Sequence, residues 1–211
     1  MTAVTVMNIF RRPLLPFLLA LLLMLSVGLQ ACTPAPPSDD FAYAAIPFTA
    51  SVRGTYTPAD QVPRPIAATV SVDAPITGGG PTGRSMTVTF TQPATLAGMA
   101  VSSVCEADPL GKLTRTVTFT YPSAYGEVKV SSAEGNLDGL LRFAEVLLPR
   151  GDVAEVSPVA EDGTHIVTRR TADGMWEGVY LFSKEHPLPL RVTVTDSRRS
   201  ETIELVVESR A

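Results

Sequence analysis

Metal-binding and cross-linking side chains are scarce in this sequence. Its 211 residues include two histidines and two cysteines. His165 and His186 have no cysteine or acidic neighbour at ligand spacing, and neither an HExxH motif nor an aspartate-rich calcium loop is present. We therefore expect no metal site and no cofactor. His186 precedes Pro187 in a predicted turn, which favours a surface histidine.

Motifs for covalent catalysis are also missing. Serines are plentiful, but none lies in a GxSxG or SxxK motif. The Gly78-Gly79-Gly80 run lacks the Gly-Lys-Ser/Thr sequence that would make it a phosphate-binding loop. A hydrolase that uses scattered residues stays an alternative, because paired glycosidase carboxylates have no fixed sequence spacing. The sequence nevertheless predicts a protein that is not an enzyme.

Positive charge is sparse and never clustered. The chain has 17 basic and 21 acidic side chains, a net charge of −4, and no run of five or more Lys or Arg residues. An acidic surface with thinly spread charge argues against binding to nucleic acid and against docking on a layer of anionic lipid head groups. We expect no nucleic-acid partner.

The N-terminus has the layout of an export signal. Arg11 and Arg12 precede an apolar run over residues 14–25, and small residues including Ala31 follow it. The run is shorter than the ~20 residues that cross a bilayer as a helix. We predict a signal peptide over residues 1–31 that is cleaved after Ala31, with an uncleaved anchor helix as the alternative.

Leu29-Gln30-Ala31-Cys32 resembles the lipobox of bacterial lipoproteins, although Gln30 is bulkier than the usual residue at that place. The resemblance implies that the Cys32 thiol receives a diacylglyceryl group and that Cys32 becomes the first residue of the mature chain. Acyl chains contribute ~0.8 kcal/mol per buried CH₂, so two or three anchor a protein stably. We therefore expect an extracytoplasmic protein on a bacterial membrane, with the choice of membrane left open.

Removal of residues 1–31 leaves 15 basic and 21 acidic side chains, a net charge of −6. Cys105 is then the one free thiol, so no intramolecular disulfide can form. Its small apolar neighbours favour a buried, inert thiol. Residues 32–40 are predicted to be the lipidated cysteine and a proline-rich tether, in which the two aspartates are solvated. Residues 41–211 are predicted to form a single β-rich domain.

Alternation of apolar and polar residues dominates the predicted domain. Period-two patterns indicate antiparallel strands with one buried and one wet face, often carrying threonine outside. These patterns occupy residues 46–53, 68–73, 85–91, 116–121, 127–131, 165–168, 188–195 and 203–207. The last two are predicted to form a hairpin around a turn at residues 196–200.

Two segments differ from this alternation. Leu137, Leu140, Leu141, Ala144, Leu147 and Leu148 recur at helical spacing. We predict one amphipathic helix over residues 137–148 that starts at Asn136, carries an Asp138–Arg142 pair and packs on the sheet. Residues 175–182 are apolar on both sides, which predicts a strand buried on both faces.

Together these elements predict an α+β, strand-dominated fold. It is a curved antiparallel sheet of about ten strands, an open half-barrel, with the amphipathic helix against its concave face. Threonine-rich strands, one mid-chain helix and the segments 178–182 and 187–194 resemble the lipoprotein-carrier group, of LolA and LppX type. That resemblance implies an apolar cavity that carries acyl chains.

The functional hypotheses follow from this fold. In the first, the protein binds an apolar acyl or lipid ligand between the helix and the sheet. The predicted ligand-binding residues are Leu140, Ala144, Leu147, Trp176, Tyr180 and Phe182. The alternative is a filled core, because aromatic side chains on one face of a central strand usually pack. In that case the protein would be a structural or protein-interaction module of the cell envelope, and an envelope hydrolase is a third hypothesis.

Overall fold

The computed structural model describes residues 39–76, 83–107, 112–123, 126–132 and 138–210. Asp39–Ala211 forms one compact unit. The predicted signal peptide, its predicted cleavage site at Ala31 and the predicted lipidation site at Cys32 lie outside the described residues. The triple-glycine loop and the predicted helix start at Asn136 and Leu137 lie outside them as well.

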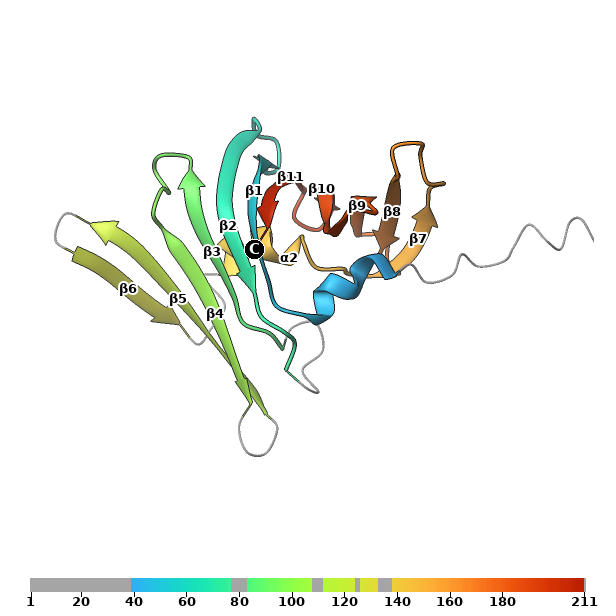
Figure 1. Ribbon diagram of the computed structural model, residues 1–211. Coiled ribbons are helices and arrows are strands. Elements are labelled where there is room, and N and C mark those ends of the chain that lie inside the picture. The colour runs from blue at the N-terminus through green and yellow to red at the C-terminus, as the bar shows by residue number, and fades with distance from the viewer. Residues whose placement is uncertain (1–38, 77–82, 108–111, 124–125, 133–137, 211) are drawn as a thin grey trace, which may run out of the picture. The chain divides into compact units, whose positions relative to one another are not determined.

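An eleven-stranded antiparallel sheet dominates the described chain (Figure 1). Its first six strands are β1 (Phe48–Thr57), β2 (Arg64–Val72), β3 (Met86–Gln92), β4 (Ala100–Ala107), β5 (Leu113–Ser123) and β6 (Gly126–Ser132). Its last five are β7 (Asp152–Val156), β8 (Thr164–Arg170), β9 (Trp176–Ser183), β10 (His186–Asp196) and β11 (Glu201–Arg210).

The strands form two meanders that meet where β1 pairs with β11. The spatial order is β6-β5-β4-β3-β2-β1-β11-β10-β9-β8-β7, so β6 and β7 are free ends and the sheet is not closed. This architecture confirms the predicted strand-dominated α+β class and the open antiparallel half-barrel. The predicted hairpin between the last two strands is also confirmed.

One face of the sheet carries the core. Ala68, Val70 and Val72 of β2 are buried, and the neighbouring β3 buries Met86 and Val88 in register with them. The other face is partly wet, and there Thr49 and Ser71 share a cross-strand hydrogen bond of 3.0 Å. Alternation in the sequence therefore identified the buried face of these strands correctly.

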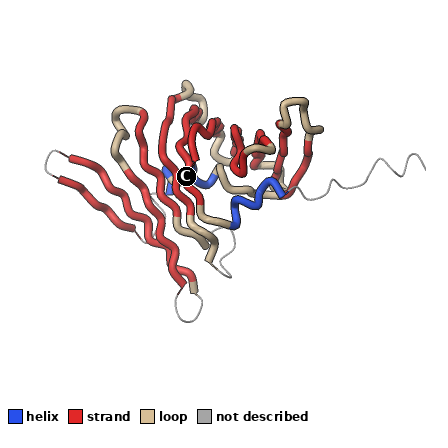
Figure 2. Tube along the Cα trace, viewed as in Figure 1, coloured by secondary structure: helices blue, strands red, loops and turns tan. Residues whose placement is uncertain are grey.

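The predicted long helix is wrong in its length. The structure has a 3₁₀ turn η4 (Asp138–Leu140) and a four-residue helix α2 (Arg142–Glu145), followed by turns to Leu148 (Figure 2). Leu141, Phe143 and Val146 are all buried, so apolar contacts surround this segment and do not form one stripe. Arg142 pairs with Glu201, whereas the side chain of its predicted partner Asp138 lies outside the description.

Burial of β9 and β10 also differs from the prediction. β9 buries Trp176, Tyr180 and Phe182, but the residues between them are half-buried, so the strand is not covered on both faces. In β10 the register shifts between His186 and Arg191 and buries Pro189. A bulge adds a residue to one strand, which explains the broken alternation there.

A short N-terminal helix was not predicted. The 3₁₀ helix η2 (Asp39–Ala45) packs against β10 and spans the expected end of the tether. Asp40 is not solvated as expected, because its Oδ1 lies 3.0 Å from Nε2 of His165. Cys105 is buried, as the sequence predicted, and His186 is exposed.

Candidate functional site

The space over the middle of β9 is filled by the protein's own side chains. The Phe41 ring of η2 lies edge-on to Tyr180 at 5.0 Å and to Phe182 at 5.2 Å. The Tyr43 hydroxyl donates a hydrogen bond to the Leu147 carbonyl. Tyr180 donates to the Leu148 carbonyl over 3.1 Å. Helix η2, β9 and the segment after α2 are thereby joined in one packed layer.

All six predicted ligand-binding residues belong to the core or its edge. Ala144, Leu147, Tyr180 and Phe182 are buried members of the core, and Leu140 packs against it half-buried. The sixth, Trp176, is also a buried member of the core, and it lines a cavity as well. Trp176 is the predicted residue that the structure places at an open space.

This cavity lies between the segment from α2 to β7 and the ends of several strands. Its volume is about 630 Å³, within the ~300–1,000 Å³ of small-molecule sites. The apolar wall consists of Met86, Val146, Leu148, Trp176, Val194 and Ile203. All six are buried. The other lining residues include five arginines and three acids.

Gly178 lets the Trp176 ring take its place. A Cβ atom at position 178 would lie 2.5 Å from Cη2 of Trp176 and 2.8 Å from Cε2 of Tyr180. Both contacts are too short for real Cβ atoms, so the two rings can fold over the strand only because residue 178 is a glycine. The Arg150 guanidinium lies over the Trp176 ring at 5.9 Å, a cation–π distance.

One buried ion pair forms part of the cavity lining. Arg142 Nη1 contacts Glu201 Oε2, and the Tyr56 hydroxyl donates to the same oxygen over 3.2 Å. Burial raises the pKa of Tyr56, and the neighbouring Glu201 carboxylate raises it further. Glu201 is 7% exposed. Its charge is therefore neutralised within the protein by Arg142.

Positive charge is in excess around the cavity. Its arginines are Arg115, Arg142, Arg150, Arg169 and Arg199, and its acids are Glu145, Asp196 and Glu201. Arg115 lies 3.7 Å from Glu145, and Arg142 pairs with Glu201. Within the described ranges, Arg150 and Arg199 form no ion pair. A lining with two surplus positive charges is notable in a chain whose net charge is −4.

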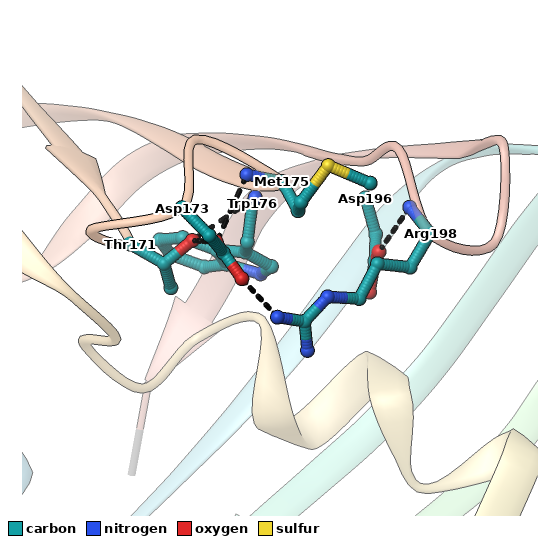
Figure 3. Close-up of polar contacts among 6 residues, drawn as sticks. All are labelled: Thr171, Asp173, Met175, Trp176, Asp196 and Arg198. Carbon is teal, nitrogen blue, oxygen red and sulfur yellow. Dashed lines mark hydrogen bonds and ion pairs between the residues drawn. The ribbon is translucent and has the colours of Figure 1, made fainter.

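A polar brace holds two turns at one edge of the cavity (Figure 3). Asp173, in the turn before β9, forms an ion pair with Arg198, in the turn before β11. Asp173 also accepts hydrogen bonds from the Thr171 hydroxyl at 2.6 Å and the Met175 amide at 3.1 Å. These bonds, that from Thr171 foremost, lower the pKa of Asp173 to about 2. The brace connects the turns that carry Trp176 and Arg199.

His165 takes part in a separate contact outside this lining. Its ring stacks on Phe182 at 5.7 Å, and its Nε2 faces Asp40. Over the described parts of the chain, no three His, Cys, Asp or Glu side chains are grouped closely enough to hold a metal ion. Within the same residues, no helix is long and apolar enough to span a bilayer.

Sequence reasoning missed most of the cavity. The arginines come from β5, α2, the loop before β7, β8 and the turn before β11, so no local pattern brings them together. The available signals were Trp176 itself and Gly178 two residues later. A small residue between two aromatics on one strand face indicates rings that need room.

Comparisons with known proteins find distant structural likeness. No family model and no curated protein matches the sequence. An uncharacterized conserved protein from Thermus thermophilus is 17% identical, with a TM-score of 0.44 over 82% of this chain and 83% of that one. A DUF1329 family protein from Desulfovibrio piger is 11% identical, with a TM-score of 0.42 over 84% and 93%. A LolA superfamily protein from Nitrosomonas europaea is 11% identical, with a TM-score of 0.41 over 82% and 90%. At these values the function has to be inferred from the cavity itself.

Proposed function

We propose that this chain is an extracytoplasmic, non-enzymatic binding protein that takes the acyl chain of a lipid into the cavity beside Trp176. The observation that carries the proposal is a space of about 630 Å³ with six buried apolar side chains in its lining. Buried apolar walls favour an apolar occupant, because each CH₂ removed from water contributes ~0.8 kcal/mol. A cavity of this kind is the default binding site of a protein without a catalytic motif.

The six sequence-predicted residues have two roles in this proposal. Trp176 contacts the ligand directly. Leu140, Ala144, Leu147, Tyr180 and Phe182 support the wall from the core behind it. The packed layer under η2 keeps β9 in place, so that the cavity is preformed and ligand binding costs little ordering entropy.

The predicted export signal and lipobox suit a protein that meets lipids. We propose that residues 1–31 are removed and that acylated Cys32 anchors the mature chain to a bacterial membrane. The anchor would keep the domain near a source of acyl chains. Mass spectrometry of the membrane form tests it directly. We expect the mature protein to begin at Cys32 and to carry the additional mass of acyl groups. A protein that keeps residues 1–31 and has an unmodified Cys32 thiol would contradict the anchor.

Trp176 is the one tryptophan in the sequence, so its fluorescence reports on the proposed site alone. We expect a bromine-labelled twelve-carbon alcohol to quench it saturably, because bromine quenches on contact. Val194→Phe places a larger side chain in the cavity and should weaken the quenching. Val206→Phe is the matched control, because Val206 is 41% exposed on the opposite face of the sheet.

The wild-type titration decides the proposal even if Val194→Phe folds poorly. A natively folded wild-type protein whose fluorescence does not respond to the probe would contradict acyl-chain binding. Native mass spectrometry of the purified protein gives a second measurement, because a co-purified lipid is expected. Failure of both tests would favour the alternative of a protein-interaction module.

A further inference from the structure

The mouth of the cavity carries two arginines whose charge the protein leaves unmatched. Arg150 and Arg199 both line the cavity and both are exposed. Of the acids in the lining, Glu201 is matched by Arg142 and Glu145 lies beside Arg115. The surplus charge therefore sits where a ligand would meet solvent.

The third acid of the lining is engaged locally. Asp196 Oδ1 accepts a hydrogen bond from the Arg198 amide over 3.0 Å, within the turn that it begins. The guanidinium of Arg198 points the other way, to Asp173. Arg169 donates to the carbonyls of Arg150 and Gly151. These polar contacts of Asp196, Arg198 and Arg169 are therefore made without the side chains of Arg150 or Arg199.

Arg150 is held in a fixed position at this mouth. Arg169 binds its carbonyl, and Gly151 after it has a φ of +69°, where a Cβ would lie 2.3 Å from the Arg170 carbonyl oxygen. The backbone conformation at this point therefore depends on the glycine. Because the Arg150 guanidinium lies over the Trp176 ring, its N–H groups remain available at its edge.

Arg199 is presented by a braced turn. Its amide donates to the Asp196 carbonyl over 3.3 Å, and the preceding Arg198 is tied to Asp173. The turn also hydrogen-bonds to the start of β9, from the Ser197 amide to the Met175 carbonyl over 2.8 Å. The Arg150 guanidinium and the backbone that carries Arg199 are therefore held in place before binding, which lowers the entropic cost of binding.

We infer that the acyl ligand carries an anionic oxyacid head group, a carboxylate or a phosphate, which Arg150 and Arg199 bind at the mouth of the cavity. A guanidinium matches these head groups through two parallel N–H···O bonds. An amphiphile with an anionic head group could contact the apolar lining with its acyl chain and the two arginines with its head group. A long-chain alcohol would gain the apolar contacts only. The inference rests on the proposed function, because the head group can reach these arginines only if the acyl chain of the ligand occupies the cavity.

Calorimetric titration with four twelve-carbon probes tests it: dodecanoate, dodecyl phosphate and dodecyltrimethylammonium below their micelle concentrations, and dodecanol below its solubility limit. We expect the anions to bind about tenfold or more tightly than the alcohol, and the cation most weakly. The comparison of dodecanoate with dodecyl phosphate identifies which head group is preferred. Calorimetry is chosen because replacing Arg150 would alter the Trp176 fluorescence.

The variant Arg150→Gln/Arg199→Gln should lose this preference and bind the anions about as weakly as dodecanol. Arg53→Gln/Arg64→Gln removes the same charge away from the cavity and should keep the preference. The head-group inference would be overturned if the wild type bound the anions and the alcohol equally, or if Arg150→Gln/Arg199→Gln kept the preference for anions. The proposed binding of an acyl chain would survive either result. If no probe binds to the folded protein, the proposed function fails with it.

Discussion

Replacing Gly54 by alanine should destabilise the sheet at the pair that joins its two meanders. Gly54 lies on β1 opposite Leu205 of β11. A Cβ at this position would lie 1.7 Å from the Glu204 carbonyl oxygen and 2.9 Å from the Leu205 Cα. Both contacts are with backbone, so no side chain can rotate away to relieve them.

The magnitude follows from the distance. Real Cβ atoms essentially never lie within 3.0 Å of such atoms, so β11 would have to move by at least 1.3 Å. Overpacking of this kind costs about 1–3 kcal/mol, and stretching the adjacent ladder hydrogen bonds adds about 1 kcal/mol. We expect the free energy of unfolding to fall by about 3 kcal/mol, a large part of the ~5–15 kcal/mol of a typical domain.

Thermal unfolding followed by far-ultraviolet circular dichroism measures this effect. At about 2–4 °C per kcal/mol for a domain of this size, Gly54→Ala should lower Tm by about 6–12 °C. Gly163→Ala is the control: Gly163 has a φ of +78° with no atom near the added Cβ. It should cost about 1–2 kcal/mol of backbone strain alone. A Gly54→Ala protein that melts within about 2 °C of the wild type would refute the steric reasoning.

Three further predictions concern the site and its supports. Tyr180→Phe removes the hydroxyl that donates to the buried Leu148 carbonyl. In urea unfolding it should lower the free energy of unfolding by about 1–3 kcal/mol. Tyr121→Phe, at an exposed tyrosine, is the control and should change this free energy little. Burial raises the pKa of Tyr43 and of Tyr180 above the ordinary value of 10.0. The unfolded chain therefore loses these protons at a lower pH than the folded chain, and the free energy of unfolding should fall as the pH rises past 10.0. A free energy of unfolding that stays constant above this pH would contradict the prediction. In an NMR titration the pKa of Asp173 should be about 2, and Thr171→Val should raise it toward 3.8.

Sequence alternation predicted the strands that have one buried and one wet face. It failed for β7, whose Asp152, Val153 and Glu155 are all exposed, because an edge strand with charge on both sides has no period. Alternation does not predict β4 either, because Ser102 and Ser103 stand between the valines that would mark a period. The pairing of β1 with β11 joins distant segments, so no local pattern indicates it.

The helical segments show a second limit of prediction from residue spacing. Leucine spacing predicted one long helix, but the chain after Leu141 buries Phe143, Val146 and Leu148 on several sides. A segment that is enclosed on several sides gains more from fitting its surroundings than from regular helical hydrogen bonds. Helix η2 was missed because its seven residues are too few for a period, although Phe41 and Tyr43 anchor it in the core.

The sequence left open whether the aromatic side chains of β9 fill a core or line a cavity, and the structure has all three in the core with Trp176 also lining a cavity. Phe41 from η2 occupies the space over Tyr180 and Phe182, so that end is packed. Trp176 is also buried, but it lines the cavity as well, and the Arg150 guanidinium lies over its ring. Substitutions at Tyr180 and Phe182 should therefore act on stability, and those at Trp176 should act on binding as well.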